Sequence, residues 1–281
     1  MNRSFGIMRF TLLSLLLCSL LSCPGTPSPG PQIQSGDRGA SQNLSDDRRI
    51  SQINIQTFDE SKDIRSAGLY LMDNPAGPIK IVNGEQDNDS VLVVAVHGYL
   101  SEGYEWITGI QNLAVHYGSL FFYRYDWDRC PDAVSSDLTR AIHSELKKHP
   151  YNKLVLFGHS YGGLVVTFAA SQLGSVNTEI NVIAAPLSGF SSLLSPCESL
   201  NYDVEGSLVY PPWKKSVKVI QHRTVHGQDG AFRDLEIDPQ VIELPFEQVQ
   251  TLPPTMDGHR LGHNWAVTWV LDQHVGKPHR Y

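Results

Sequence analysis

The chain has 281 residues, of which 41% are hydrophobic, and a formal net charge of −7. The length allows one sizeable core behind a short amino-terminal region. Its acidic balance disfavours nucleic acid as a partner, and it also disfavours electrostatic attachment to anionic lipid, because both need basic surfaces.

Residues 1–22 have the pattern of a signal peptide. Arg3 and Arg9 are their only charges, and the apolar run that follows is too short for a comfortable membrane span. Residues 20–23, Leu-Leu-Ser-Cys, resemble a bacterial lipoprotein lipobox, in which cleavage precedes a cysteine that is then diacylated. The sequence therefore predicts export to the bacterial cell envelope, with a membrane anchor on Cys23. An ordinary secretory signal cut nearby is the alternative.

Residues 23–51 are predicted to be a flexible tether, because they are rich in Pro, Gly, Ser, Gln and Asp and have few apolar residues to bury. Residues 52–281 then form one domain. Only Cys130 and Cys197 remain in it, and in an exported protein they either pair as a disulfide or stay free. Their positions do not suggest a metal site.

The domain alternates strand and helix patterns. A short hairpin is predicted from 69–72 and 78–82. Apolar runs typical of buried parallel strands lie at 91–96, 119–125, 153–157, 181–185 and 217–221, with 240–244 as a candidate last strand. Helical patterns lie at 105–117, 135–148, 161–173 and 264–273.

This alternation predicts an α/β fold with a mostly parallel central sheet and helices on both faces. The segment 187–215 is rich in Ser and Pro and fits neither pattern. It is the candidate for a small cap insertion over the active site.

The motif on which the functional prediction depends is Gly158-His159-Ser160-Tyr161-Gly162, placed between a strand pattern and a helix pattern. This G-x-S-x-G arrangement is typical of a nucleophile elbow, a turn so tight that only glycine fits two residues before and two residues after the serine. The following helix N-terminus also favours negative charge. We therefore predict Ser160 as a nucleophile.

A serine nucleophile needs a base and a carboxylate that orients the base. Asp229 is the predicted carboxylate, since it lies in a glycine-rich turn after the strand pattern at 217–221. An Asp-Gly pair can also simply form a tight turn. Three carboxylates farther along are the substitutes: Asp234, Glu236 and Asp238.

The predicted base is His263, which stands immediately before the last helical pattern. His259 in the same loop is the alternative, and whichever histidine is not the base would be a solvated loop residue or a partner of the other. His97, in a His-Gly turn after the strand pattern at 91–96, is predicted to hold its loop by hydrogen bonding rather than to act as the base.

That turn, His97-Gly98-Tyr99, resembles the His-Gly turn of lipases, where the residue after the glycine gives one backbone N–H to the oxyanion. Tyr99 would fill this role here. Tyr161, directly after the serine, would give the second N–H of the oxyanion hole.

The region from about 91 to 273 resembles the α/β-hydrolases of the lipase and esterase branch. The order Ser160, Asp229, His263 is the order found in that family. The segment Tyr-Asp-Trp-Asp at 125–128 is similar to the Tyr-Asp-Trp-Arg of lipases like lecithin:cholesterol acyltransferase. Ala-Pro-Leu-Ser-Gly at 185–189 is similar to the Thr-Pro-His-x-Gly that follows a strand in many lipases.

The resemblance implies hydrolysis of a small-molecule or lipid ester through an acyl-enzyme, with no cofactor. An acyltransferase would use the same three residues, and a noncatalytic binding lipoprotein on this scaffold would use none. Amides and thioesters remain open as substrates. Four aromatic residues near the two motifs suggest an apolar acyl pocket, or are ordinary packing: Tyr99, Tyr104, Trp106 and Tyr161.

Overall fold

The computed structural model describes residues 50–58, 63–84, 90–189, 194 and 197–277. The predicted signal peptide, the tether up to residue 49 and Cys23 lie outside the described residues. Within the described part of the chain, no helix is both long enough and apolar enough to cross a membrane.

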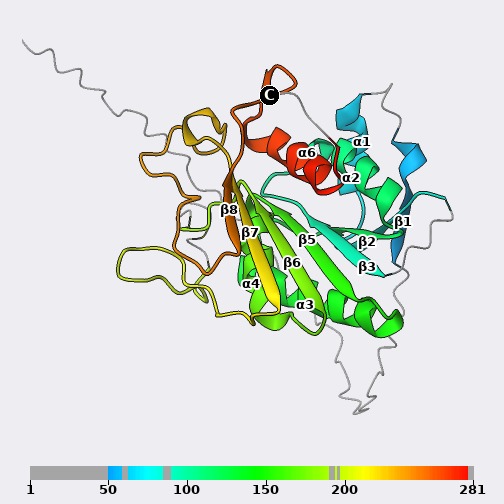
Figure 1. Ribbon diagram of the computed structural model, residues 1–281, viewed down its shortest axis with the longest axis horizontal. Helices are drawn as coiled ribbons and strands as arrows, with labels where there is room; N and C mark the ends of the chain where they lie inside the picture. Colours follow the sequence, from blue (N-terminus) through cyan, green and yellow to red (C-terminus); the bar gives the residue numbers. More distant parts are fainter. Residues whose placement is uncertain (1–49, 59–62, 85–89, 190–193, 195–196, 278–281) are drawn as a thin grey trace, which may run out of the picture. The chain divides into compact units, whose positions relative to one another are not determined.

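An eight-stranded sheet runs through the centre of the domain in the order β1-β2-β4-β3-β5-β6-β7-β8 (Figure 1). β2 pairs antiparallel with β4, and every other neighbouring pair in this sheet is parallel. The strands are β1 (Ser51–Asn54), β2 (Gly77–Val82), β3 (Val91–Val96), β4 (Ser119–Arg124), β5 (Lys153–His159), β6 (Asn177–Ile183), β7 (Val217–Arg223) and β8 (Gln248–Thr251).

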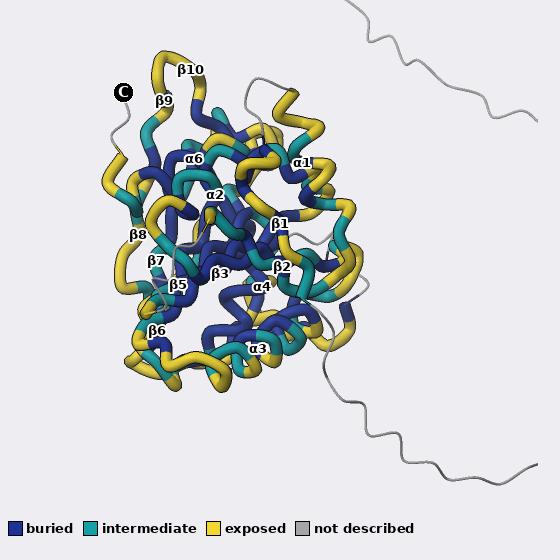
Figure 2. The backbone as a smooth tube through the Cα atoms, turned by 90° about the vertical axis from the view of Figure 1, so that its right-hand side faces the viewer, coloured by how far each residue is buried: buried dark blue, intermediate teal, exposed yellow. Residues whose placement is uncertain are grey.

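Helices cover both faces of the sheet, as Figure 2 shows edge-on. One face carries α1 (Ile64–Met72), α2 (Tyr104–His116) and α6 (Gly262–His274), and the other carries α3 (Pro131–Lys148) and α4 (Tyr161–Ala169). The remaining pieces are the 3-10 turns η1 (Ile55–Thr57), η2 (Ala170–Gln172) and η3 (His226–Gln228), and the small hairpin of β9 (Thr255–Met256) and β10 (His259–Arg260). This confirms the predicted mostly parallel α/β architecture.

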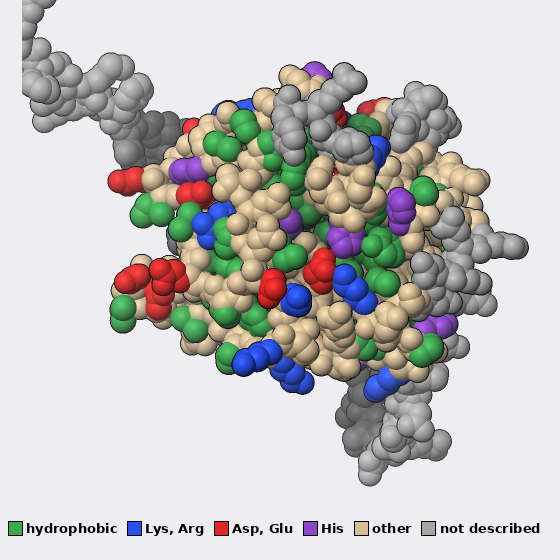
Figure 3. Space-filling model, viewed as in Figure 1, with side chains coloured by type: hydrophobic (Ala, Val, Ile, Leu, Met, Phe, Trp, Pro, Cys, Tyr) green, Lys and Arg blue, Asp and Glu red, His purple; other side chains and the backbone are tan. Residues whose placement is uncertain are grey.

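The continuous apolar runs of the central strands supply two cores, because successive strand side chains point to opposite faces. In β5, Leu154 and Leu156 join the core under α3 and α4, whereas Val155 and Phe157 join the core under α1, α2 and α6. On the face seen in Figure 3, acidic, basic and apolar side chains are interspersed.

The predicted opening hairpin is wrong in its first half. Residues 69–72 form the last turn of α1, and β2 pairs instead with β1 and β4. The helix is favoured at its start by Asp63, whose carboxylate accepts the backbone N–H of Arg65 at 3.1 Å. At Gly68 an added Cβ would lie 2.3 Å from the backbone N of Tyr104, so the helix packs closely on the start of α2.

The predicted last strand is also displaced along the chain. Residues 240–244 are not a strand, and β8 forms the sheet edge instead. The polar groups of Gln240 are used elsewhere: its carbonyl accepts from the Gln221 side chain at 2.6 Å, and its side-chain oxygen accepts the Thr224 N–H at 2.9 Å.

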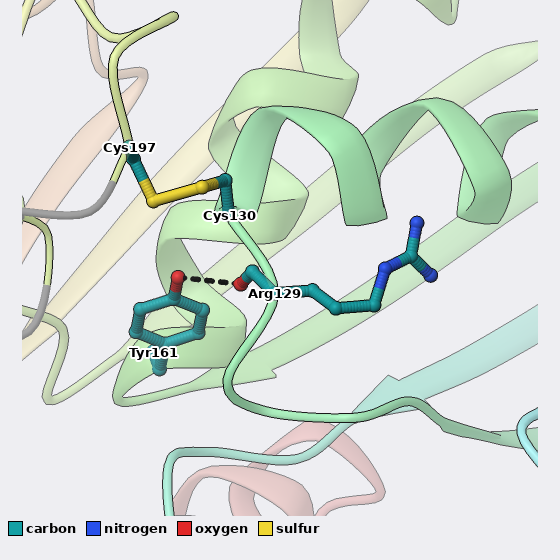
Figure 4. Close-up of a disulfide and its surroundings, with 4 residues drawn as sticks. All are labelled: Arg129, Cys130, Tyr161 and Cys197. Carbon is teal, nitrogen blue, oxygen red and sulfur yellow. Dashed lines mark hydrogen bonds between the residues drawn. A yellow bond between two sulfur atoms is a disulfide. The ribbon is translucent and has the colours of Figure 1, made fainter. Parts of the chain in front are cut away.

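Within the segment 187–215, Leu187, Leu208 and Tyr210 are buried in the core on the α3 and α4 side of the sheet, whereas residues 201–206 are exposed. A disulfide between Cys130 and Cys197, with Cα atoms 5.6 Å apart, joins this segment to the start of α3 (Figure 4). The pairing that the sequence leaves open is therefore formed.

Candidate active site

Ser160 is the single residue between the end of β5 and the start of α4. Its backbone has φ 54° and ψ −120°, a conformation that non-glycine residues rarely adopt. The residues two positions before and after it must be glycines. An added Cβ would lie 2.5 Å from the Gly162 carbonyl oxygen if placed on Gly158, and 2.3 Å from the His97 carbonyl oxygen if placed on Gly162. The strained turn predicted from the motif is therefore present, and tight packing on both sides enforces it.

The loop after β3 comes close to this serine. An added Cβ on Gly98 would lie only 2.9 Å from the Cβ of Ser160 and 3.1 Å from the carbonyl oxygen of His159. The absence of a side chain at Gly98 therefore lets the backbone leading into Tyr99 pass directly beside Ser160.

His97 holds that loop through its ring. Its Nε2 accepts the backbone N–H of Tyr125 at 3.1 Å, so the ring proton is on Nδ1, which donates to the Gly98 carbonyl at 2.8 Å. The ring also stacks on Tyr125 with centroids 4.2 Å apart. Burial lowers the pKa of His97 to about 4. The neutral, fully bonded ring has the loop-holding role predicted for it.

Asp229 and His263 meet although 34 residues separate them in sequence. His263 Nδ1 lies 3.0 Å from Oδ2 of Asp229, whose side chain is fully buried. The carboxylate also accepts the Thr224 hydroxyl and the backbone N–H groups of Ala231 at 2.8 Å and Phe232 at 3.2 Å. Burial alone would raise the pKa of Asp229, but the hydrogen bond and charge of His263 and the other donors hold it below its usual value.

The alternative residues lie elsewhere. His259 is exposed on the β9–β10 hairpin and does not line the pocket that contains Ser160. Asp234 and Glu236 are exposed, and Asp238 accepts the backbone N–H of Gln240 at 3.0 Å. The geometry therefore pairs Asp229 with His263. Within the described part of the chain, it pairs neither His259 with a carboxylate nor one of the three alternative carboxylates with His263.

Ser160 and His263 both line one pocket of about 280 Å³. Its wall is mostly polar, with side chains from α1, the loop before α2, the first turn of α2 and the start of α6: Arg65, Ser101, Glu102, Tyr104, Glu105 and Asn264. Of the four aromatic residues noted in the sequence, Tyr99 and Tyr104 line the pocket, whereas Trp106 and Tyr161 are buried in the cores. The pocket is thus more polar than those aromatic residues suggest.

Comparison with known proteins identifies the family of this chain. A model of the Alpha/beta hydrolase family matches residues 93–271. The chain belongs to that family. No curated protein sequence matches it significantly.

Solved structures similar to this α/β-hydrolase include Est1E from Butyrivibrio proteoclasticus, with 14% identity over 67% of this chain and 88% of that one, at a TM-score of 0.43. A lipase-esterase related protein from Clostridium acetobutylicum is 13% identical over 70% and 96% of the two chains, at a TM-score of 0.43. An esterase from Pyrococcus furiosus is 11% identical over 74% and 91%, also at 0.43.

One residue of the hydrolase site was not singled out from the sequence, although it lies inside the central motif. His159 Nε2 donates to the backbone carbonyl of His263 at 3.2 Å, and the two rings lie 4.7 Å apart. Burial holds the pKa of His159 well below its usual value, so the ring is neutral. The residue before the serine therefore positions the first turn of α6, which carries His263.

Three polar residues of the pocket wall could not be identified from a motif: Arg65, Glu105 and Asn264. Asn264 follows His263, and its amide donates to the Tyr104 hydroxyl at 2.5 Å, which links α6 to α2 across the pocket. Among the described residues, no group of three or more His, Cys, Asp or Glu side chains is arranged to hold a metal ion.

Proposed function

We propose that this α/β-hydrolase cleaves carboxylic esters through Ser160, His263 and Asp229. The observation that carries the proposal is the 3.0 Å contact between His263 Nδ1 and the buried Asp229 carboxylate, with His263 in the same pocket wall as Ser160. Because Nδ1 donates to Asp229, Nε2 is left as the nitrogen that can take a proton from the serine.

In the proposed reaction, Ser160 Oγ attacks the ester carbonyl carbon while its proton passes to His263 Nε2. The tetrahedral intermediate then collapses, and the leaving alcohol takes that proton, which gives an acyl-enzyme. Water repeats the two steps and releases the acid. Asp229 stays ionised throughout, which agrees with its lowered pKa, and stabilises the positive charge that forms on the imidazole.

The oxyanion would be stabilised by the backbone N–H groups of Tyr99 and Tyr161. Tyr161 is the first residue of α4, and a first-turn N–H has no acceptor within its own helix. The close approach of Gly98 to Ser160 supports the placement of Tyr99 on the other side. Loss of one such donor typically raises the barrier by about 3 kcal/mol.

A fluorophosphonate probe and p-nitrophenyl esters of increasing acyl length test this proposal. We expect a covalent adduct on Ser160 and ester turnover, both abolished in Ser160→Ala. Ser175→Ala, at an exposed serine outside the pocket, is the matched control and should retain both. Absence of labelling in the folded wild-type protein would exclude the catalytic proposal and favour a binding role for the same scaffold.

We also propose that the enzyme is exported and anchored through a lipid on Cys23. The Cys130–Cys197 disulfide supports export, because disulfides persist in oxidising compartments, and the Leu-Leu-Ser-Cys sequence at 20–23 is the basis for the lipid. In a bacterial host, the wild-type chain should fractionate with membranes and incorporate labelled palmitate, whereas Cys23→Ala should do neither. A wild-type chain that is recovered unlipidated outside the membrane would show an ordinary secretory signal instead.

A further inference from the structure

Glu105 is a carboxylate beside the proposed active site that the reaction itself does not use. It lies in the first turn of α2, is only 7% exposed, and lines the pocket together with Ser160 and His263. The Ser101 hydroxyl donates to its Oε1. Burial raises its pKa. The backbone N–H of Glu105 is a second donor to the carboxylate, and the pocket is where a ligand could provide a further one.

The surroundings of Glu105 combine donors and acceptors. The Tyr104 hydroxyl accepts from Asn264 at 2.5 Å, which leaves the proton of that hydroxyl to donate. The Arg65 guanidinium lies 5.6 Å from the centroid of the Tyr104 ring and brings a positive charge to the rim. Glu102, which is exposed, brings a second negative charge.

A neutral substrate is the one that no charged neighbour repels. A carboxylate or phosphate would face both glutamates, and an ammonium group would face Arg65 as well as the glutamates. An alkyl chain would cover Glu105 and remove its access to water without offering a hydrogen bond, which costs roughly 1–3 kcal/mol for a buried polar group. A hydroxyl both donates and accepts and carries no charge, so it suits every one of these neighbours.

We propose that this pocket binds a neutral, hydroxyl-bearing part of the ester substrate, and that Glu105 accepts a hydrogen bond from one of its hydroxyls. The proposal rests on the ester hydrolysis proposed above and narrows its substrate class. Glu105 would thus be a specificity residue, in contact with the substrate but not with the bond that is broken.

Two matched pairs of esters test the substrate class with the purified protein. The alcohol side is tested by 2,3-dihydroxypropyl butanoate against propyl butanoate, and the acyl side by methyl 3-hydroxybutanoate against methyl butanoate. We expect kcat/KM to be at least about tenfold higher for the hydroxylated member of one pair, because a site built for a hydroxyl rejects the analogue that lacks it. Choline butanoate tests for recognition of a cation and should be a poorer substrate than the dihydroxypropyl ester.

Variants then assign the preference to the side chain. Glu105→Leu should lose about tenfold in kcat/KM on the preferred hydroxylated ester while changing the plain ester by less than about twofold. Glu105→Gln, whose amide oxygen can still accept from a hydroxyl, should keep most of the preference, and Glu105→Ala serves if the leucine variant does not fold. Glu243→Leu, an exposed glutamate away from the pocket, is the matched control.

The outcomes separate the two proposals. If Ser160 is labelled by the fluorophosphonate and both members of each pair are cleaved at equal rates, the hydroxyl proposal is overturned and the ester proposal stands. A preference that persists in Glu105→Leu, or faster cleavage of choline butanoate, overturns it too. If Ser160 is not labelled and no ester is cleaved, both proposals fail.

Discussion

At the scale of single residues, the arrangement around His263 fixes which of its nitrogens carries the proton. Asp229 accepts from Nδ1, and His159 holds the backbone carbonyl of His263 from the other side. Asp229 is itself fixed by the Thr224 hydroxyl and by two backbone N–H groups, so the carboxylate is aimed before any substrate arrives.

Asp229→Asn should therefore lower kcat strongly. The backbone donors of Ala231 and Phe232 would keep the amide oxygen, so the amide NH₂ would face Nδ1 and force the proton onto Nε2, the wrong tautomer for a base. We expect a fall of about 10⁴-fold on a p-nitrophenyl ester. Asp234→Asn, an exposed neighbour, is the control. A loss of less than about tenfold in the folded variant would show that Asp229 is not the carboxylate of the triad.

At the scale of elements, the turn after β3 and the turn after β5 are fitted to each other. Gly98→Ala would place a Cβ 2.9 Å from the Ser160 Cβ, so one of the two turns must move. Because Tyr99 follows Gly98, this displacement should remove one proposed oxyanion donor and lower kcat by about 10²–10³-fold.

Gly227→Ala is the matched control, since nothing lies within 4 Å of the Cβ it would add. Unfolding by urea, followed by circular dichroism, separates a displaced turn from a general loss of structure. Activity of Gly98→Ala equal to that of the control would mean that the loop after β3 supplies no donor.

The elements that could be predicted from sequence are those whose side chains are needed in both cores. The apolar runs of β3 and β5 have few other interpretations, because only a covered parallel strand places every residue in apolar surroundings. Residues 69–72 are a short apolar run like that of a strand, but the cap at Asp63 and the close packing of Gly68 on α2 favour a helix.

In the candidate site, the three proposed catalytic residues could be predicted from the sequence, whereas the pocket wall could not. Ser160, Asp229 and His263 each occur at a recognisable junction of a strand or helix with a loop. The pocket wall has no such signature, because Arg65, Glu105 and Asn264 come from three elements that only the folded chain brings together. Their polarity therefore emerges from tertiary structure alone.

At the scale of the whole molecule, buried neutral histidines should make the protein sensitive to acid. Burial lowers the pKa of His97 and of His222 to about 4 each. An unfolded histidine titrates near pH 6.5, so the stability from each residue is present above that pH and is lost as the pH falls toward 4. Between pH 7.5 and pH 5, each should cost about 2 kcal/mol of unfolding free energy.

Urea unfolding at the two pH values measures this loss. His222→Gln keeps a side-chain donor for Asn181, which His222 Nε2 contacts at 3.0 Å, but cannot titrate. Its loss of stability between pH 7.5 and pH 5 should therefore be smaller than that of the wild type by about 2 kcal/mol. An identical pH dependence in the variant would show that the pKa of His222 is the same in the folded and the unfolded protein.

The disulfide ties the segment containing Cys197 to the start of α3, across 67 residues of sequence. Replacing both cysteines with serine should lower the unfolding free energy by about 2–4 kcal/mol. Figure 4 shows a second connection: the Tyr161 hydroxyl donates to the carbonyl of Arg129 at 2.8 Å, directly before Cys130. The double variant should therefore also lower kcat, because Tyr161 carries a proposed oxyanion donor.

Tyr161→Phe keeps the disulfide and the backbone N–H but loses that hydrogen bond. It should reproduce the effect on kcat with a smaller loss of unfolding free energy. Unchanged kcat in both variants would show that neither the disulfide nor the Tyr161–Arg129 hydrogen bond affects catalysis.

His263 lies in the first turn of α6, where the adjacent Asn264 binds Tyr104 of α2. The other end of α6 is held by the Asn112–Asp272 hydrogen bond at 2.5 Å and by the contact of His274 with Tyr117, just after α2, at 3.0 Å. The position of the imidazole therefore depends on contacts along the whole helix. On heating, detachment of α6 would therefore separate His263 from Ser160 while the central sheet is still intact. Loss of ester turnover should therefore occur at a lower temperature than loss of β structure. The midpoint temperature measured by turnover should be lower than the midpoint temperature measured by circular dichroism.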